Sequence, residues 1–302
     1  MSYGYPQQQQ RRPFRLRLLP ILIGMVMIGL TMVSQCQEGP FGRKQIVALN
    51  PEQEKALGAQ AFQEVLSTER RLTSGPLVEA IRTIADRLTV AAENPMFLDK
   101  AKLPAQPMEW KVEVVDGEQQ NAFCLPGGKI VVYTGILPIA ETDAGLATVL
   151  GHEISHALAH HGAERMAQEQ LVQMGVMSIG GAAGDMSPEQ RMRVMQVLNA
   201  GAKFGILKYS RSHESEADHM GLLIMAAAGY DPRESMHFWE RMQSSTGKGS
   251  APPEFMSTHP SHGTRIADLK AWLPEAMPLY EASAKLPTKK LPAANFGPRM
   301  LP

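Results

Sequence analysis

The stretch GHEISHALAHHG, residues 151–162, gathers four histidines and one acid on a short apolar segment. The histidines are His152, His156, His160 and His161, and the acid is Glu153. His152 and His156 are four residues apart, so on a helix their imidazoles lie on one face, about one turn apart. Two neutral imidazoles at this spacing can bind one zinc ion.

Glu153 directly follows the first of these histidines and would lie beside the open face of the zinc ion. There it can accept a proton from a water molecule whose pKa zinc lowers to about 7. This is the HExxH arrangement of metallopeptidases. The neighbours Leu150, Ile154 and Leu158 are apolar, so we expect a largely buried helix, whose polar side chains need partners. The alternative is a helix with incidental surface histidines.

The third zinc ligand must come from elsewhere in the chain, because a catalytic zinc site uses three protein ligands. Three ligands in a row along one straight helix cannot converge on a tetrahedral centre. We therefore expect His160 and His161 to be exposed or to support the ligands from outside.

The better candidate lies in YSRSHESEADHMG, residues 209–221, where two acids are four residues apart. Glu214 can supply the third ligand oxygen, and Asp218 can accept the N–H of a ligating histidine. Glu216 is expected to point elsewhere, toward solvent. The alternative is that these acids form a charged helix face that pairs with Arg211.

The composition excludes some classes of protein. The chain has 302 residues, with 30 Lys and Arg against 30 Asp and Glu, and 44% of its residues are hydrophobic. This length suits one large domain or two small ones. The neutral charge balance gives no reason to expect a nucleic-acid partner. Cys36 and Cys124 form neither a disulfide framework nor a CxxC zinc site.

The N-terminus carries a membrane or export signal. A polar and basic tail, residues 1–17, precedes an apolar run from Leu18 to Val33, so residues 18–35 fit a signal-anchor or a signal peptide. The arginines before the run predict that this end stays in the cytoplasm and that the rest lies outside, on the periplasmic side. Cys36 directly after this segment suggests a second option, lipid attachment at Cys36 as in lipoproteins. Ser34 and Gln35 match the lipoprotein signal poorly, because a small residue normally stands immediately before the lipidated cysteine. The alternative, a buried soluble helix, lacks a polar face.

Residues 50–280 are predicted to form one domain, followed by a Pro-rich, loose tail over residues 281–302. Asn50 as N-cap and Pro51 at the first helical position indicate a helix start. Further helices are predicted at 76–92, 143–161, 188–208, 214–228 and 232–243, strands at 110–115 and 130–133, and a small-residue loop at 175–185. The pattern indicates an α+β domain that is mainly helical with a small sheet.

Five motifs resemble the gluzincin metallopeptidases of the HtpX and CAAX-prenyl-endopeptidase group, especially the Oma1-like, periplasmic quality-control branch. They are NPEQEKALG, NAFCLPGGKIVVYTGIL, GHEISHALAHHGAERM, YSRSHESEADHMG and THPSHGTRI, in family order. The resemblance covers most of residues 50–266 and implies a zincin-like fold. It also implies one zinc ion held by His152, His156 and Glu214, with Glu153 as general base and acid.

The resemblance implies further parts of an active site. Asn121, Ala122 and Phe123, with Cys124 and the strand that follows, would form an edge along which an extended peptide lies by β-augmentation. His259 and Arg265 would lie near the zinc, where either could stabilise the tetrahedral oxyanion. His259 could instead approach the zinc and block it. A simpler alternative is that His259 and Pro260 cap a helix from Ser261.

The sequence thus predicts a zinc metalloendopeptidase tethered to a membrane, and the family resemblance implies unfolded or damaged envelope polypeptides as its substrates. Two alternatives stay open: a chaperone-like or binding factor with a latent protease site, and an exported lipoprotein with a structural zinc. The chain departs from the family's periplasmic members, which often carry extra repeats or paired cysteines. Its single N-terminal segment, unlike the several spans of prenyl proteases, argues against prenylated substrates.

Overall fold

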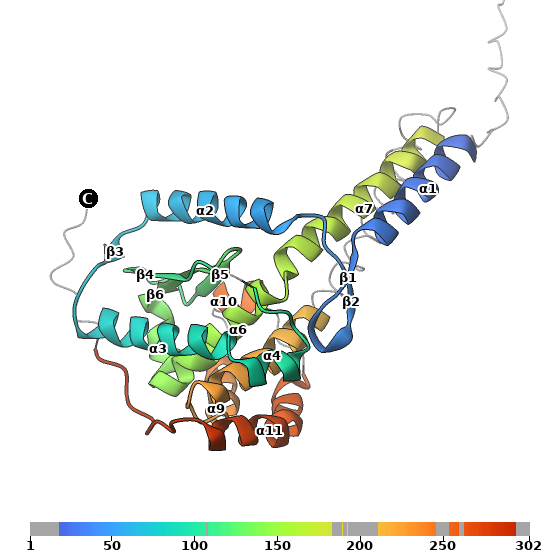
Figure 1. Ribbon diagram of the computed structural model, residues 1–302. Coiled ribbons are helices and arrows are strands. Elements are labelled where there is room, and N and C mark those ends of the chain that lie inside the picture. Colours follow the sequence, from blue (N-terminus) through green and yellow to red (C-terminus); the bar gives the residue numbers. More distant parts are fainter. Residues whose placement is uncertain are drawn as a thin grey trace, which may run out of the picture. The chain divides into compact units, whose positions relative to one another are not determined.

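The computed structural model describes residues 18–106, 108–182, 189, 192, 211–245, 254–259 and 263–293. Helices dominate, and the strands form a four-stranded sheet and a two-stranded hairpin (Figure 1). The predicted α+β class, mainly helical with a small sheet, is confirmed. The described residues fall into two compact units: residues 18–35 with 168–182, 189 and 192, and the remainder.

The smaller unit contains α1 (Leu18–Ser34) and the end of α7 (His161–Ala182). These helices touch at Gly24, where any added Cβ would collide with the Ser178 side chain. The loop predicted over 175–185 is wrong up to Ala182, because α7 continues through its glycines. Within the described residues, no helix is both long enough and apolar enough to cross a membrane.

The four-stranded sheet belongs to the larger unit. Its strands are β3 (Arg71–Leu72), β4 (Lys111–Val115), β5 (Ala122–Leu125) and β6 (Lys129–Tyr133), in the order β3-β4-β6-β5. β4 and β6 are parallel, and the other neighbours are antiparallel. β5 therefore lies at an edge of the sheet. The strand after it, β6, is interior, so the edge implied by the resemblance does not extend to it.

Helices cover both faces of the sheet (Figure 1). Side chains alternate along β6, so that Ile130 and Val132 join the main core with α3 (Pro76–Ala92) and α6 (Asp143–Leu158). Val131 and Tyr133 point to the opposite face and pack against Phe62 of α2 (Pro51–Thr68). The sheet is thereby fixed between α2 and α6.

The predicted helix starts are confirmed where capping residues signal them. Asn50 caps α2 through a reciprocal pair of hydrogen bonds with Gln53, and Pro51 is the first helical residue. α3 has the predicted bounds. α6 begins after Thr142, whose hydroxyl accepts a hydrogen bond from the Gly145 N–H at 3.0 Å. It ends at Leu158 rather than at 161, because His160 adopts a left-handed backbone conformation with φ 56°.

The remaining elements surround this framework. They are β1 (Cys36–Glu38), β2 (Lys44–Ile46), α4 (Pro95–Ala101), α5 (Leu137–Ala140), helical residues 211–227, α9 (Glu234–Ser245), α10 (Glu254–Thr258), α11 (Arg265–Ala282) and two 3-10 turns, Pro40–Gly42 and Thr134–Ile136. The helix predicted over 188–208 lies outside the described residues, apart from Glu189 and Met192, which are helical.

Part of the predicted Pro-rich tail contacts the larger unit. The Leu286 N–H donates to the Gly229 carbonyl at 2.9 Å, and the Leu291 N–H donates to that of Glu141 at 3.0 Å. The first two tail residues, 281 and 282, end α11. A loose tail was expected from the proline content, which does not report contacts of this kind.

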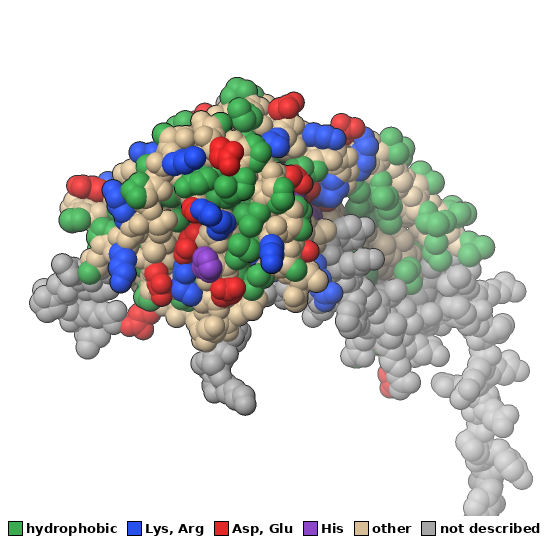
Figure 2. Space-filling view, turned by 90° about the horizontal axis from the view of Figure 1, so that it is seen from below, with side chains coloured by type: hydrophobic (Ala, Val, Ile, Leu, Met, Phe, Trp, Pro, Cys, Tyr) green, Lys and Arg blue, Asp and Glu red, His purple; other side chains and the backbone are tan. Residues whose placement is uncertain are grey.

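On the face that Figure 2 shows, Lys and Arg side chains are mixed with Asp and Glu over the described surface.

Candidate metal centre

Four side chains of the larger unit converge on one point. His152, His156, Glu214 and His259 each place one potential ligand atom within 4.8 Å of all the others. The two α6 histidines share one face of the helix, as predicted, with their Nε2 atoms 3.1 Å apart. Glu214 comes from the helix over 211–227, and His259 directly follows α10. The sequence-predicted ligands are thus brought together, and His259 joins them.

A close contact between two backbones allows this convergence. An added Cβ on Gly221 would lie 2.8 Å from the backbone nitrogen of His152, and one on Gly151 would lie 3.0 Å from the Gly221 carbonyl oxygen. The two helices therefore pack without side chains between them. As a result Glu214, two turns before Gly221, reaches His152 with its Oε2 atom 3.3 Å from Nε2.

Asp218 and Arg265 contact the ligand residues His152 and Glu214 and fix their orientation. The Asp218 Oδ1 atom lies 2.9 Å from His152 Nδ1, so it can accept the Nδ1–H and leave Nε2 facing the group. Arg265 is fully buried and donates from Nε to Asp218 at 2.6 Å and from Nη2 to Glu214 at 3.0 Å. Its guanidinium stacks 3.8 Å from the Trp239 ring. Arg265 was expected to stabilise an oxyanion, but its guanidinium donates instead to the carboxylates of Asp218 and Glu214.

A second chain of contacts supports His156. His156 Nδ1 lies 2.8 Å from His161 Nδ1, and His161 Nε2 lies 2.8 Å from Glu216. Arg43 binds Glu216 and Glu164, each at 2.8 Å. If His161 donates its Nε2–H to Glu216, its Nδ1 accepts from His156, which leaves the His156 Nε2 lone pair facing the group.

These contacts correct the prediction for Glu216 and distinguish between His160 and His161. Glu216 was expected to face solvent but is only 8% exposed, because Arg43 from the β1–β2 hairpin covers it. His161 is buried and contacts His156, whereas His160 lies apart and pairs with Glu54 at 2.7 Å. Of the two histidines, therefore, His161 supports the group.

Glu153 lies beside the four-residue group. Its side chain is buried, and its Oε1 atom is 3.3 Å from His259 Nε2. Burial raises the pKa of Glu153, whereas His259, His152 and a hydrogen bond from the Cys124 backbone lower it; the net shift is upward. Cys124 belongs to β5, so the edge strand directly adjoins Glu153. Asn121, Ala122 and Phe123, the expected peptide-binding residues, span the start of that strand.

Burial and the neighbouring carboxylates shift the pKa values of the group in opposite directions. Burial lowers the pKa of His152, but hydrogen bonds to Asp218 and Glu214 outweigh it and raise the pKa to about 10. Burial alone would raise the pKa of Glu214, yet the hydrogen bonds from His152 and His259 hold it far below its usual range. Burial holds the pKa of His156 well below its usual value, so this imidazole is neutral, as a metal ligand must be.

Comparison with known proteins identifies the family. The sequence model of peptidase family M48 matches residues 85–273 of this chain. This range includes the four converging residues, Glu153 and Arg265. The chain belongs to peptidase family M48. This confirms the resemblance that the five motifs indicate.

Relatives of the Oma1 type are among the similar proteins. The mitochondrial metalloendopeptidase OMA1 of Schizosaccharomyces pombe is 34% identical over 72% of this chain and 65% of its own length. The Saccharomyces cerevisiae protein of the same name is 35% identical over 76% of this chain and 64% of its own length. The beta-barrel assembly-enhancing protease of Yersinia pestis is 26% identical over 78% of this chain and 47% of its own length.

The chain therefore spans about 65% of the length of the first of these relatives. Among solved structures, the crystal structure of S. mikatae Ste24p is similar with a TM-score of 0.47 and 17% identity, over 72% of this chain and 55% of that one.

Proposed function

We propose that this chain is a zinc-dependent metalloendopeptidase that hydrolyses peptide bonds. The observation that carries the proposal is the convergence of His152, His156 and Glu214 with Glu153 buried beside them. The relatives named metalloendopeptidase or protease support the same reaction. In this proposal the three converging residues hold the metal, one ion per chain, and Glu153 transfers protons.

The residues present fit zinc. Two imidazole nitrogens and one carboxylate oxygen are ligand atoms that zinc prefers in catalytic sites. Their ligand atoms lie within 4.8 Å of one another, and His152 and Glu214 are buried. When bound, zinc supplies a Lewis acid that polarises the scissile carbonyl and lowers the pKa of water.

Glu153 performs the proton transfers in this mechanism. Its carboxylate accepts a proton from the attacking water as the bond from the water oxygen to the carbonyl carbon forms. It then donates that proton to the amide nitrogen as the C–N bond breaks, so that an acid and an amine leave. Burial raises the pKa of Glu153 above its usual value, which suits a carboxyl group that must both accept and donate a proton.

Other buried residues position the ligands. Asp218 fixes the tautomer of His152, and His161 fixes that of His156, so that both Nε2 atoms face the metal. Arg265 clamps Asp218 and Glu214 together. We therefore assign Arg265 a positioning role in place of oxyanion stabilisation.

The substrate is proposed to be an extended polypeptide that adds to the edge of the sheet along β5. A peptide paired along Asn121, Ala122 and Phe123 would bond to the outward-facing backbone groups of Ala122, because the Asn121 carbonyl already accepts a hydrogen bond from the Tyr133 N–H. It would then lie next to Glu153. An unfolded segment can adopt this extended form, which suggests misfolded or damaged membrane and envelope proteins as substrates. The relative named for the assembly of β-barrel proteins supports this class.

The location is proposed to be a membrane surface, with the metallopeptidase domain outside the cytoplasm. The support is α1, whose large apolar side chains are exposed, among them Leu19 at 67% and Val33 at 81%. The basic flank before α1 predicts the orientation. Cys36, exposed in β1, would be the site of any lipid attachment.

A second candidate function follows from the position of His259. With four protein ligands, a zinc site is closed and has no open position for water. His259 Nδ1 lies 3.1 Å from Glu214 and 3.2 Å from His152 Nε2, close enough to serve as the fourth ligand. The chain would then be a latent peptidase or a binding factor with a structural zinc. Under this candidate, His259→Ala increases cleavage; under the first, it leaves cleavage unchanged or reduces it.

The test is cleavage of casein by the full chain, purified as wild type, Glu153→Gln and Glu240→Gln. Glu240 is 58% exposed on α9 and serves as the matched control. We expect cleavage by wild type and Glu240→Gln, loss with a chelator, recovery with added zinc and none by Glu153→Gln. Equal cleavage by Glu153→Gln would refute the proposed role of this residue.

A further inference from the structure

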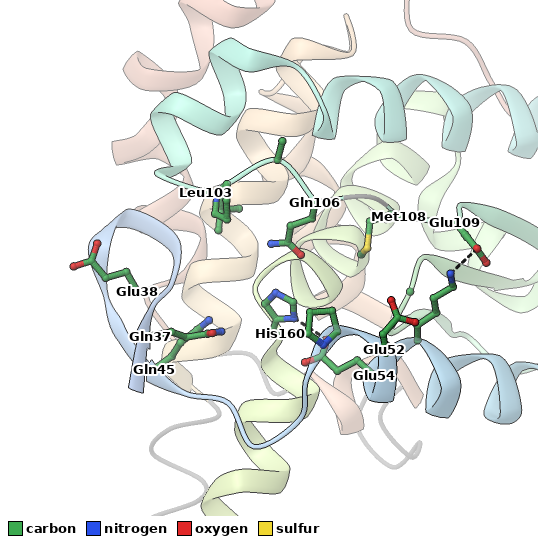
Figure 3. A pocket seen from close by; sticks show the side chains of 15 residues that line it. Gln37, Glu38, Gln45, Glu52, Glu54, Leu103, Gln106, Met108, Glu109 and His160 are labelled. Carbon is green, nitrogen blue, oxygen red and sulfur yellow. Dashed lines mark hydrogen bonds and ion pairs between the residues drawn. The ribbon is translucent and has the colours of Figure 1, made fainter. Parts of the chain in front are cut away.

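A cavity of about 460 Å³ lies in the larger unit, apart from the four-residue group (Figure 3). It is bounded by the β1–β2 hairpin, the first turn of α2, the segment after α4 and His160. One side is apolar, formed by Leu103, Pro104 and Met108. The other side carries carboxylates. Such a cavity has separate places for an apolar stem and a charged end.

Glu54 is the most buried charged residue that lines this cavity. It is only 6% exposed, and His160 Nδ1 contacts its Oε2 atom at 2.7 Å. Its Oε1 atom is buried and has no hydrogen-bond partner among the described residues. A buried carboxylate is costly unless it is paired and hydrogen-bonded. Glu54 therefore has capacity for one more donor, which a ligand in the cavity can provide.

Most of the other charges that line the cavity already have partners. Glu109 pairs with Lys55 at 2.7 Å, and Glu38 pairs with Lys44 at 2.7 Å. Glu52 is exposed and adds a further carboxylate to the same wall, two residues before Glu54. The balance in the cavity is therefore negative, with Glu54 at its buried end. Its complement is a positively charged group on an apolar stem.

The cavity is close enough to the edge strand for a peptide bound there to reach it. Gly127, which lines the cavity, follows β5 by two residues and Cys124 by three. The Cys124 backbone bonds to Glu153. Gly127 belongs to the turn over residues 126–128, so it lies no farther from Cys124 than the roughly 10 Å that three extended residues would span. A side chain within about four residues of the scissile bond can therefore enter the cavity.

We propose that this cavity is a substrate subsite that takes a lysine or arginine side chain of the bound polypeptide. The stem of that side chain packs against Leu103 and Met108, and its charged end binds Glu54 and Glu52. The inference rests on the proposed peptidase function, whose substrate class it narrows. An antiparallel peptide would place the basic residue before the scissile bond, and a parallel one after it.

The test uses the full chain and peptides that differ at one position, scanned over four residues on each side of the cleaved bond. The residues compared are lysine, arginine, norleucine and glutamate. We expect one position where lysine or arginine lowers KM about tenfold relative to norleucine, as one charge-assisted hydrogen bond predicts, with little change in kcat. Glu54→Gln is expected to remove this preference, and Glu240→Gln to keep it.

Two further measurements keep the test decisive. Glu52→Gln, an exposed change that should not disturb folding, is expected to reduce the preference in the same direction. Binding of fluorescein-labelled lysine and norleucine peptides to Glu153→Gln, measured by anisotropy, tests the subsite without cleavage. Tighter binding of the lysine peptide with no cleavage by wild type would support the subsite while the peptidase function fails. Equal KM and equal binding for lysine and norleucine at every position would overturn the inference.

Discussion

At the scale of single residues, the orientation of His152 depends on Asp218. The carboxylate accepts the His152 Nδ1–H at 2.9 Å, so Nε2 is free for a metal. Asp218→Asn keeps the shape of the side chain but removes its charge and can present an N–H in place of an acceptor. We predict that zinc affinity falls about 10–100-fold. Competition with a chelating dye measures this, and Asp99→Asn, an exposed change on α4, is the control.

An unchanged affinity in Asp218→Asn would mean that the tautomer of His152 does not depend on this contact. Arg265 provides a related check, because it bonds to the other oxygen of Asp218. Its loss should therefore weaken zinc binding and leave KM for peptides unchanged, since the guanidinium lies behind the ligands. A rise in KM alone would point to contact with substrate instead.

At the scale of elements, the close packing of α6 against the helix over 211–227 depends on two glycines. An added methyl group at Gly221 would lie 2.8 Å from the His152 backbone nitrogen. We predict that Gly221→Ala separates the helices and lowers the free energy of unfolding by about 1–3 kcal/mol. Thermal unfolding with and without zinc measures the change.

The matched control is Gly162→Ala in the first turn of α7, where an added Cβ meets no atom within 4 Å among the described residues. This substitution should be neutral or stabilising, because alanine favours the helix. If both variants lose the same stability, the close approach at Gly221 is not the cause.

The β1–β2 hairpin is held by Arg43, which binds the buried Glu164 and Glu216. Arg43→Met removes the guanidinium from both carboxylates, and we predict a loss of about 3–5 kcal/mol. Urea unfolding at pH 7 measures it. A loss below about 1 kcal/mol, typical of exposed pairs, would contradict the account.

The same ion pairs predict a pH dependence. Burial raises the pKa of Glu164, but His213 and Arg43 outweigh it and lower the pKa to about 2. A carboxylate whose pKa is lower in the folded state stabilises it above the unfolded pKa of about 4.3, and this contribution is lost as pH falls toward 2. Arg43→Met should therefore unfold in acid at a higher pH than wild type. Circular dichroism during acid titration detects the shift.

At the scale of the whole molecule, local signals predicted helix starts and the HExxH face, because a cap or a four-residue spacing acts within one turn. The start of α2 follows from Asn50 and Pro51, and the bounds of α3 follow from the helical periodicity of residues 76–92. The end of α6 could not be predicted, since His160 takes a left-handed conformation without the glycine that usually signals it.

The contact between Glu216 and Arg43, which supports the site, could not be predicted for a different reason. Glu216 looks like a solvent-facing acid on its own helix, and Arg43, which covers it, is 173 residues away in the chain. No pattern within one element reports such a contact. By contrast, Glu214 and Asp218 were predicted, because the HExxH motif requires a third ligand and a partner for its histidines.

We propose that His152, His156 and Glu214 bind zinc, whereas Glu153 acts in the chemistry without binding it. The measurement that tests it most directly is zinc content per chain in the full-length wild type, Glu153→Gln and Glu214→Gln, each with its rate of casein cleavage. We expect one zinc and cleavage in wild type, one zinc without cleavage in Glu153→Gln, and loss of both in Glu214→Gln. No zinc in wild type, or full cleavage by Glu153→Gln, would contradict it.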